Sequence, residues 1–198
     1  MHLLLRCYDI NVRLGHHDSL MKAELVSARF SELIKIRLPW LLVGLMGGLL
    51  ASVIVSRFET SLRENIALAF FIPVIAYMSD AVGTQTETIF IRALTNLKFN
   101  IPKYILRELW VGAFMGSVMG FLTGVFAYFL SGSIKIGFVV SFSLFLAMTI
   151  ATILACVTPL ILRSLGKDPA VGSGPFTTAL QDVVSLTIYL IVVVMVLG

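Results

Sequence analysis

Apolar residues run along this chain in stretches long enough to cross a membrane. Residues 38–56 are uncharged and lie between Arg37 and Arg57, and at 1.5 Å per residue they nearly match the roughly 30 Å hydrocarbon thickness of a bilayer. Two longer uncharged stretches, 109–134 and 136–162, are separated only by the short SGSIK turn. We predict one membrane span in each, as the first, third and fourth spans of the chain.

Two further apolar stretches are too short to cross a membrane unless they include an acidic residue. Residues 65–79 end at Asp80, and residues 183–198 follow Asp182, so each falls short of the roughly 20 residues that a span needs. The second and fifth spans must therefore each contain an aspartate. The pattern predicts an all-α integral membrane protein with five transmembrane helices per chain.

Helix-breaking residues surround both aspartates. Pro73 and Gly83 flank Asp80, and the SGPF segment, residues 173–176, precedes Asp182. Proline removes a backbone donor and glycine permits non-helical angles, so we expect helices two and five to be broken, with carbonyl oxygens free to face a cation. The alternative is a kink that serves packing alone.

Basic residues divide the chain into two regions and suggest its orientation. We expect residues 1–37 to form a cytoplasmic leader that ends in an amphipathic interfacial linker helix, and residues 38–198 to form the five-helix transmembrane domain. Lys and Arg gather in the leader and in the second and fourth connections, which places these on the cytoplasmic side. The prediction is a multi-pass protein of the plasma membrane, with its N-terminus in the cytoplasm and its C-terminus outside.

The composition supports a membrane protein and argues against a nucleic-acid partner. The chain is 58% hydrophobic and 13% charged, against the roughly 25% charged residues of a typical soluble domain. Its formal net charge is +4, but the basic residues border apolar stretches and form no single patch. The lipid bilayer is therefore the expected partner.

The two aspartates should lie at one depth in the membrane. Counted from the outer surface, Asp80 lies about 22 Å down and Asp182 about 24 Å down. Each costs about 2.5 to 3.5 kcal/mol at the centre of a membrane helix, and no Lys or Arg within the spans is available at that depth. A metal ion, a proton or a water-filled cavity must therefore compensate the charge.

The side chains near the aspartates favour a hard cation. Asp80, Asp182, Thr178 and Gln85 are oxygen donors, which suit Mg²⁺, Ca²⁺ or Mn²⁺, and no histidine lies in any span. Thr178 precedes Asp182 by four residues and shares its helix face, although its hydroxyl could instead bind its own backbone. We expect Mg²⁺, or else Mn²⁺, Co²⁺ or Ca²⁺, as a transported ion, and no cofactor.

Two other features allow more than one interpretation. Glu87 follows Asp80 by seven residues, on the same helix face and about 10 Å deeper, so it either guards the exit of the ion or is a solvated residue at the interface. Glycines recur every fourth residue on the third span, at 112, 116, 120 and 124. Such GxxxG motifs predict a closely packed helix, from the same chain or from a partner.

Three segments resemble the membrane domain of MgtE-type magnesium transporters: residues 28–59, 72–94 (IPVIAYMSDAVGTQTETIFIRAL) and 168–190 (DPAVGSGPFTTALQDVVSLTIYL). The resemblance implies a homodimer with a central pore lined by helices two and five. It implies that Asp182 is the pore aspartate, with Thr178 one turn earlier. Gly83 and Gln85 match the family's Asn-x-Gly-x-Gln-like stretch.

The chain also departs from that family. Ala81 stands where asparagine is usual and Asp80 where glycine is common, so an extra carboxylate is expected to strengthen cation binding or to couple transport to another ion. The cytoplasmic sensor modules that many members carry before the first span are not in this sequence. Regulation of that kind should then be absent, unless this sequence is part of a longer protein or a separate cytoplasmic protein provides it.

The residues favour passive transport over the other functions considered. An inside-negative potential favours entry of a doubly charged ion by about 4.6 kcal/mol per 100 mV, so a carboxylate-lined, channel-like pore needs no ATP. The alternatives are a Mg²⁺ exchanger coupled to Na⁺ or H⁺ and a noncatalytic membrane scaffold. An enzyme is not expected, because Asp80 in SDAVG and Asp182 in LQDV lack the GxGD context of intramembrane aspartyl proteases.

Overall fold

The computed structural model describes residues 29–96, 99–166 and 169–197, and within these ranges every regular element is a helix. Three long helices, α6, α7 and α8, follow a more interrupted first half. The elements are α2 (Phe30–Arg57), α3 (Glu59–Glu64), α4 (Ile66–Ala69), α5 (Ile72–Asn96), α6 (Ile101–Ser131), α7 (Ile134–Ser164) and α8 (Pro169–Leu197).

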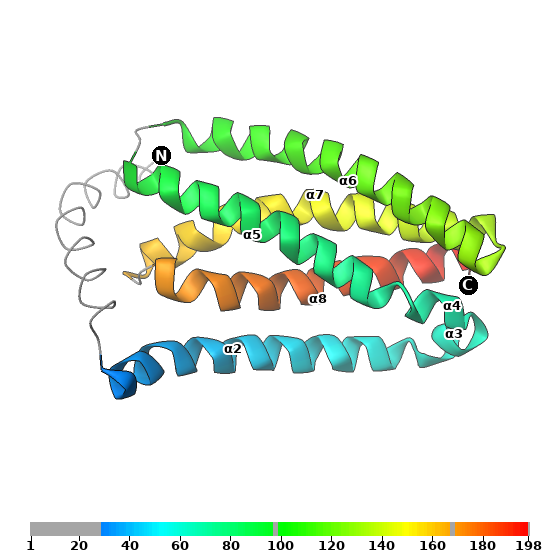
Figure 1. Cartoon of the computed structure of the whole chain (residues 1–198), viewed down its shortest axis with the longest axis horizontal. Coiled ribbons are helices and arrows are strands. Elements are labelled where there is room, and N and C mark those ends of the chain that lie inside the picture. The colour runs from blue at the N-terminus through cyan, green and yellow to red at the C-terminus, as the bar shows by residue number, and fades with distance from the viewer. Residues whose placement is uncertain (1–28, 97–98, 167–168, 198) are drawn as a thin grey trace.

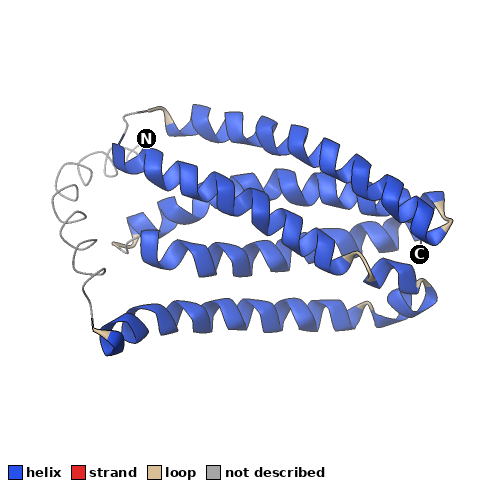
Figure 2. Ribbon diagram, in the orientation of Figure 1, coloured by secondary structure: helices blue, strands red, loops and turns tan. Residues whose placement is uncertain are grey.

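Five segments of the described chain are long and apolar enough to cross a membrane, and they confirm the predicted all-α architecture. They are Phe30–Arg57, Ile66–Leu94, Ile101–Ser131, Ile134–Ser164 and Gly172–Leu197. All five run back and forth along the long axis of the molecule, joined at its two ends (Figures 1 and 2). The first of them, α2, begins eight residues before the predicted span, and the linker segment before residue 29 lies outside the described residues.

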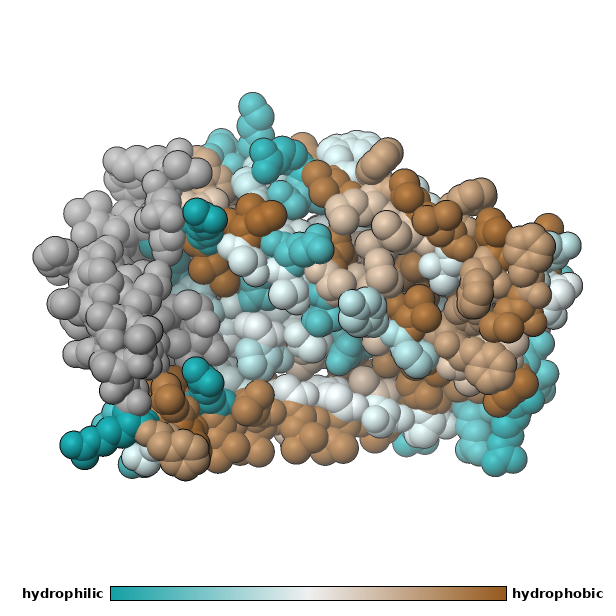
Figure 3. Space-filling model, in the orientation of Figure 1, coloured by the Kyte–Doolittle hydropathy of each residue, from teal (hydrophilic) through white to brown (hydrophobic). Residues whose placement is uncertain are grey.

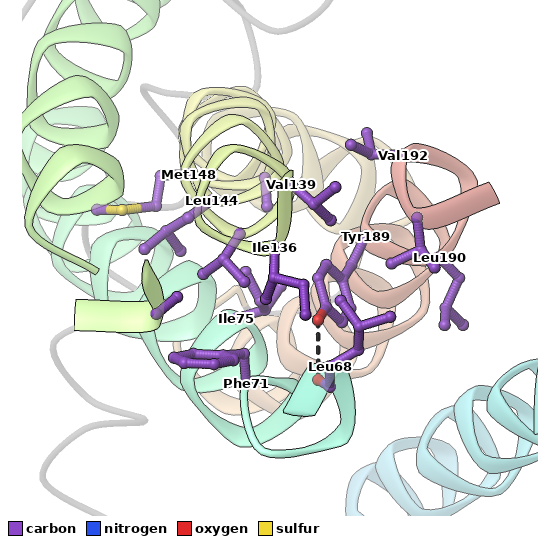
Figure 4. Packing of buried hydrophobic residues seen from close by; sticks show 14 of the residues in the cluster. Leu68, Phe71, Ile75, Ile136, Val139, Leu144, Met148, Tyr189, Leu190 and Val192 are labelled. Atoms are coloured by element: carbon purple, nitrogen blue, oxygen red, sulfur yellow. Dashed lines mark hydrogen bonds between the residues drawn. The ribbon is translucent and has the colours of Figure 1, made fainter. Parts of the chain in front are cut away.

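Helix α7 lies at the centre of the bundle. It packs most extensively against α6 and also contacts α5 and α8, whereas α2 packs mainly against α8. In Figure 1, α2 lies at the edge of the bundle, next to α8. Near one end of the bundle, a cluster of buried apolar side chains from α4, α5, α7 and α8 forms the main core (Figure 4).

The glycine stripe on α6 packs within the chain, which settles whether its neighbour belongs to the same chain or to a partner. All four glycines are buried against α7. A Cβ at Gly116 would lie 2.9 Å from the Phe145 carbonyl oxygen, and one at Gly120 would lie 2.6 Å from the Ser141 carbonyl oxygen. Because those obstacles are backbone atoms, only glycine allows this approach.

The second span is interrupted, but before the aspartate. Short helix α4 ends at Ala69, a turn covers Phe70 and Phe71, and α5 begins at Ile72 with Pro73 in its first turn. The Tyr189 hydroxyl of α8 donates a 2.8 Å hydrogen bond to the Leu68 carbonyl at this turn (Figure 4). From Ile72 onward the helix continues without a break through Asp80 and Gly83.

The predicted break in the fifth span is wrong, because α8 is continuous from Pro169 to Leu197 with Pro175 inside it. Membrane helices tolerate an internal proline where neighbouring structure accommodates it. Here α2 packs closely on this part of α8, with Trp40 over Gly172 and Gly44 beside Pro175. Carbonyls released by an unwound α8 are therefore not part of the site.

Candidate cation site

Thr178 and Asp80 join α8 to α5 at the predicted depth of the site. The Thr178 hydroxyl donates a 2.7 Å hydrogen bond to Asp80 Oδ1, across 98 positions of the sequence. This hydroxyl therefore bonds to the neighbouring helix and not to its own backbone. Both residues are half-buried, and the bond uses only one of the two carboxylate oxygens of Asp80.

Asp182 lies one helical turn after Thr178 on the same face of α8. It too is half-buried, and its carboxylate is close enough to that of Asp80 for the two negative charges to repel each other. Among the described residues neither aspartate forms a salt bridge. The structure thus brings together the three residues expected at one layer: two carboxylates and a hydroxyl that bonds to one of them.

Gly83 contributes to the site through its lack of a side chain. A Cβ there would overlap the Gln181 carboxamide, so the amide packs directly on the α5 backbone. Gln181 Nε2 donates a 3.2 Å hydrogen bond to the Ala151 carbonyl of α7. Gln181, which the sequence did not single out, therefore connects α5, α7 and α8 immediately beside Asp182.

Gln85 is not part of this group within one chain. It follows Asp80 by five residues, which places it about 140° around the helix. Its side chain is exposed, as are those of Thr84 and Thr88. Figure 3 shows hydrophilic side chains gathered over the central part of α5 and the strip toward α2, whereas the end of this face near the C-terminus is mostly hydrophobic.

Glu87 is buried against α8, so the interpretation as a solvated interfacial residue is wrong. Only 5% of the residue is exposed. Its carboxylate interacts with the Ser173 and Thr177 hydroxyls of α8, and the charge of Asp80 also reaches it. Glu87 thus lies on the same α5–α8 interface as the aspartates, but about 10 Å along the helix from Asp80.

A second buried glutamate, Glu108 on α6, was not predicted. It accepts a 3.4 Å hydrogen bond from the Thr86 hydroxyl of α5, and its other oxygen lies 3.5 Å from Arg107 Nη2. In the sequence it stands directly after Arg107 at the edge of the uncharged stretch 109–134. The only sequence signal was its spacing of four residues from Gly112, on the buried face of the helix.

The geometry limits what one chain provides. Within the described ranges no three His, Cys, Asp or Glu side chains converge on a point where they could hold a metal ion. A hard divalent cation prefers six or more oxygen ligands, and Mg²⁺ keeps several of its waters. Asp80, Asp182 and Thr178 therefore suit a partly hydrated ion better than a fully dehydrated one.

Comparisons with known proteins match the part of the chain that contains this site. A family model named MgtE, described as a divalent cation transporter, matches residues 72–192, which include both aspartates. Among curated proteins, the magnesium transporter MgtE of Bacillus subtilis is 40% identical over 156 residues, covering 77% of this chain and 35% of the relative. The magnesium transporter MgtE of Thermus thermophilus is 34% identical over 157 residues, covering 78% of this chain and 35% of its own length. The chain thus spans about a third of the length of the relatives that it matches.

Proposed function

Because the chain belongs to the MgtE family of divalent cation transporters, we propose that it carries divalent cations, Mg²⁺ foremost, across a membrane past Asp80, Thr178 and Asp182. The curated relatives named as magnesium transporters support Mg²⁺ as the transported ion. Mn²⁺, Co²⁺ and Ca²⁺ share its preference for oxygen ligands and are the expected competitors.

The observation that carries this proposal is the pairing of two carboxylates on neighbouring membrane helices. Asp80 is held by the Thr178 hydroxyl at 2.7 Å, and Asp182 lies one turn away. Two such charges at membrane depth repel each other and are costly without a counter-charge. A passing dication supplies that charge and leaves again, since the site does not enclose it.

We further propose that the path is completed by a second copy of the chain. The exposed polar side chains of α5, at Thr84, Gln85 and Thr88, cannot face lipid hydrocarbon without cost. A homodimer with α5 and α8 around a central, water-filled pore would cover them. Gln85 would then line the pore, although it points away from the aspartates of its own chain.

Transport through this pore is proposed to be passive and channel-like. The distribution of Lys and Arg, which favours the cytoplasmic side, supports a plasma-membrane topology with the N-terminus in the cytoplasm and the C-terminus outside. An inside-negative potential would then drive uptake.

The test is divalent flux into liposomes that contain the purified chain, with Asp182→Asn as the variant. Mg²⁺ entry, followed by a trapped fluorescent indicator, should fall about tenfold or more when the carboxylate is removed. Glu59→Gln is the matched control, because Glu59 is a surface residue paired with Arg63 on α3. Equal flux through the wild type and Asp182→Asn would refute the site, and flux that requires an imposed Na⁺ or H⁺ gradient would favour the exchanger.

A further inference from the structure

Three oxygen-bearing side chains meet between α5 and α8, beyond the aspartate pair. Glu87 projects from α5 toward Ser173 and Thr177, which lie one turn apart on α8. This glutamate–hydroxyl cluster is defined here as Glu87, Ser173 and Thr177. It is drier than the aspartate pair, with exposed fractions of 5%, 1% and 1% for the three residues.

Two oxygen atoms of the cluster lack a partner. Within the described part of the chain, neither Glu87 Oε1 nor Thr177 Oγ1 makes a hydrogen bond, although both are buried. Ser173 is different, because its hydroxyl donates to the Pro169 carbonyl and so presents only lone pairs to the cluster. The Thr177 hydroxyl can give its one proton to the Glu87 carboxylate, which leaves the hydroxyl lone pairs and the carboxylate charge without an electropositive partner. Buried polar atoms are nearly always satisfied in folded proteins, so this arrangement indicates a missing cation.

The charge of the cluster is also uncompensated by the described residues. Glu87 has no salt bridge among them, and the charge of Asp80 adds repulsion. A buried carboxylate without a partner is strongly disfavoured. We propose that this cluster binds a dehydrated monovalent cation of the size of Na⁺.

The ligands favour a monovalent ion over the transported dication. The cluster offers a single carboxylate, which balances one positive charge, together with neutral hydroxyl oxygens. Mg²⁺ gives up its waters reluctantly and requires near-octahedral coordination, which a closed site with one carboxylate does not provide. The more open aspartate pair, with two carboxylates, suits the hydrated dication instead.

The site is separate from the proposed divalent path and does not depend on it. Glu87 lies about 10 Å from Asp80 along α5, so an ion at one position does not share ligands with an ion at the other. Removal of the Asp182 carboxylate should therefore lower divalent flux while leaving the monovalent site intact.

Direct binding of radioactive ²²Na⁺ to the purified full chain in detergent tests the proposal. Wild-type protein should show saturable binding that unlabelled Na⁺ displaces and choline does not. Glu87→Gln and Thr177→Val should each weaken this binding about tenfold or more, because each removes an oxygen ligand or its charge. Asp182→Asn should bind ²²Na⁺ like the wild type.

A matched control separates ligand loss from general damage. Thr187→Val makes the same change on α8, but its hydroxyl donates a 2.6 Å hydrogen bond to the Val183 carbonyl of its own helix, so its binding should be unchanged. Thr177→Val is nearly isosteric and guards against a folding defect in Glu87→Gln. The proposal is overturned if the wild type has no saturable ²²Na⁺ binding, or if folded Thr177→Val binds as well as Thr187→Val.

Discussion

The Thr178 hydroxyl links α8 to α5 at the candidate site. It donates to Asp80 Oδ1 on α5, although a threonine in a membrane helix commonly bonds to its own backbone. Thr187, further along α8, does bond to its own helix. The two threonines therefore provide a pair in which only one hydroxyl orients a carboxylate.

Thr178→Val should weaken divalent transport without removing a charge. Loss of a partner that orients a metal-binding carboxylate typically lowers affinity 10–100-fold, so half-saturating Mg²⁺ should rise by about tenfold in liposome flux. Thr187→Val should leave it unchanged. The same half-saturation in both variants would mean that Thr178 does not orient Asp80 for the ion.

Gly83→Ala should destabilise the packing behind Asp182. The new Cβ overlaps the Gln181 carboxamide, which must move and lose its bond to the Ala151 carbonyl. Overpacking of this kind costs about 1 to 3 kcal/mol. The midpoint of thermal unfolding in detergent should fall relative to Gly48→Ala, where nothing lies within 4 Å of a Cβ; equal midpoints would contradict the predicted overlap.

At the level of single residues, the sequence identified charges better than their neighbours. Asp80 and Asp182 stood out because each interrupts an apolar stretch that is too short to span a membrane. Gln181 and Glu108 gave no such signal, since a glutamine beside an aspartate and a glutamate beside an arginine are ordinary. Gln181 packs on Gly83, and Glu108 accepts a hydrogen bond from Thr86. These contacts form only in the folded chain.

At the scale of elements, the start and end of α6 and the start of α7 are marked by capping residues that can be recognised in the sequence. Asn100 Oδ1 accepts a 3.1 Å hydrogen bond from the Lys103 amide and caps α6. Gly132 ends that helix in the left-handed conformation, with φ of 66°. Ser133 then caps α7 by accepting from the Ile136 amide, so an N-cap, a C-cap glycine and a second N-cap occur in order.

The interruption of the second span depends instead on tertiary contacts. Pro73 predicted a break in this span. The break occurs at the Phe70–Phe71 turn, where the buried Tyr189 hydroxyl of α8 donates a hydrogen bond to the Leu68 carbonyl. Pro175 gave an equally strong sequence signal, yet α8 continues through it. Whether a proline breaks a membrane helix or lies within a continuous one therefore depends on the neighbouring helices, which the sequence around the proline does not show.

Tyr189→Phe should therefore destabilise the junction of α4 and α5. The substitution removes one buried hydrogen bond and keeps the ring, so the expected cost is about 1 kcal/mol. A lower midpoint of thermal unfolding measures it. Tyr128→Phe is the control, because Tyr128 is 46% exposed, and a Tyr189→Phe midpoint equal to that of the control would exclude a stabilising role for the bond.

At the scale of the whole molecule, the distribution of polar surface separates the faces of the bundle. The outer face of α6 presents apolar residues such as Trp110, Phe114 and Phe121, as expected against lipid. The exposed face of α5 presents Thr84 and Gln85 instead. Of these two faces, only that of α5 requires water or a second subunit.

Cysteine labelling in the membrane should distinguish these faces. With Cys7 and Cys156 replaced by serine, Thr84→Cys and Gln85→Cys should react with a small, water-soluble methanethiosulfonate, because the proposed pore would bring water to them. Phe114→Cys, at a position 73% exposed within the chain, should react much more slowly from within lipid. Similar rates at all three positions would contradict an aqueous path along α5.

The seam between α2 and α8 has a mechanical consequence. The Trp40 ring fills the place of a missing side chain at Gly172, and Ala179 fills the corresponding place at Gly47. With notches at both points, α2 cannot slide along α8 without first separating from it. A displacement of the Phe30 end of α2 along the helix axis would therefore move α8 as well, together with Thr178 and Asp182.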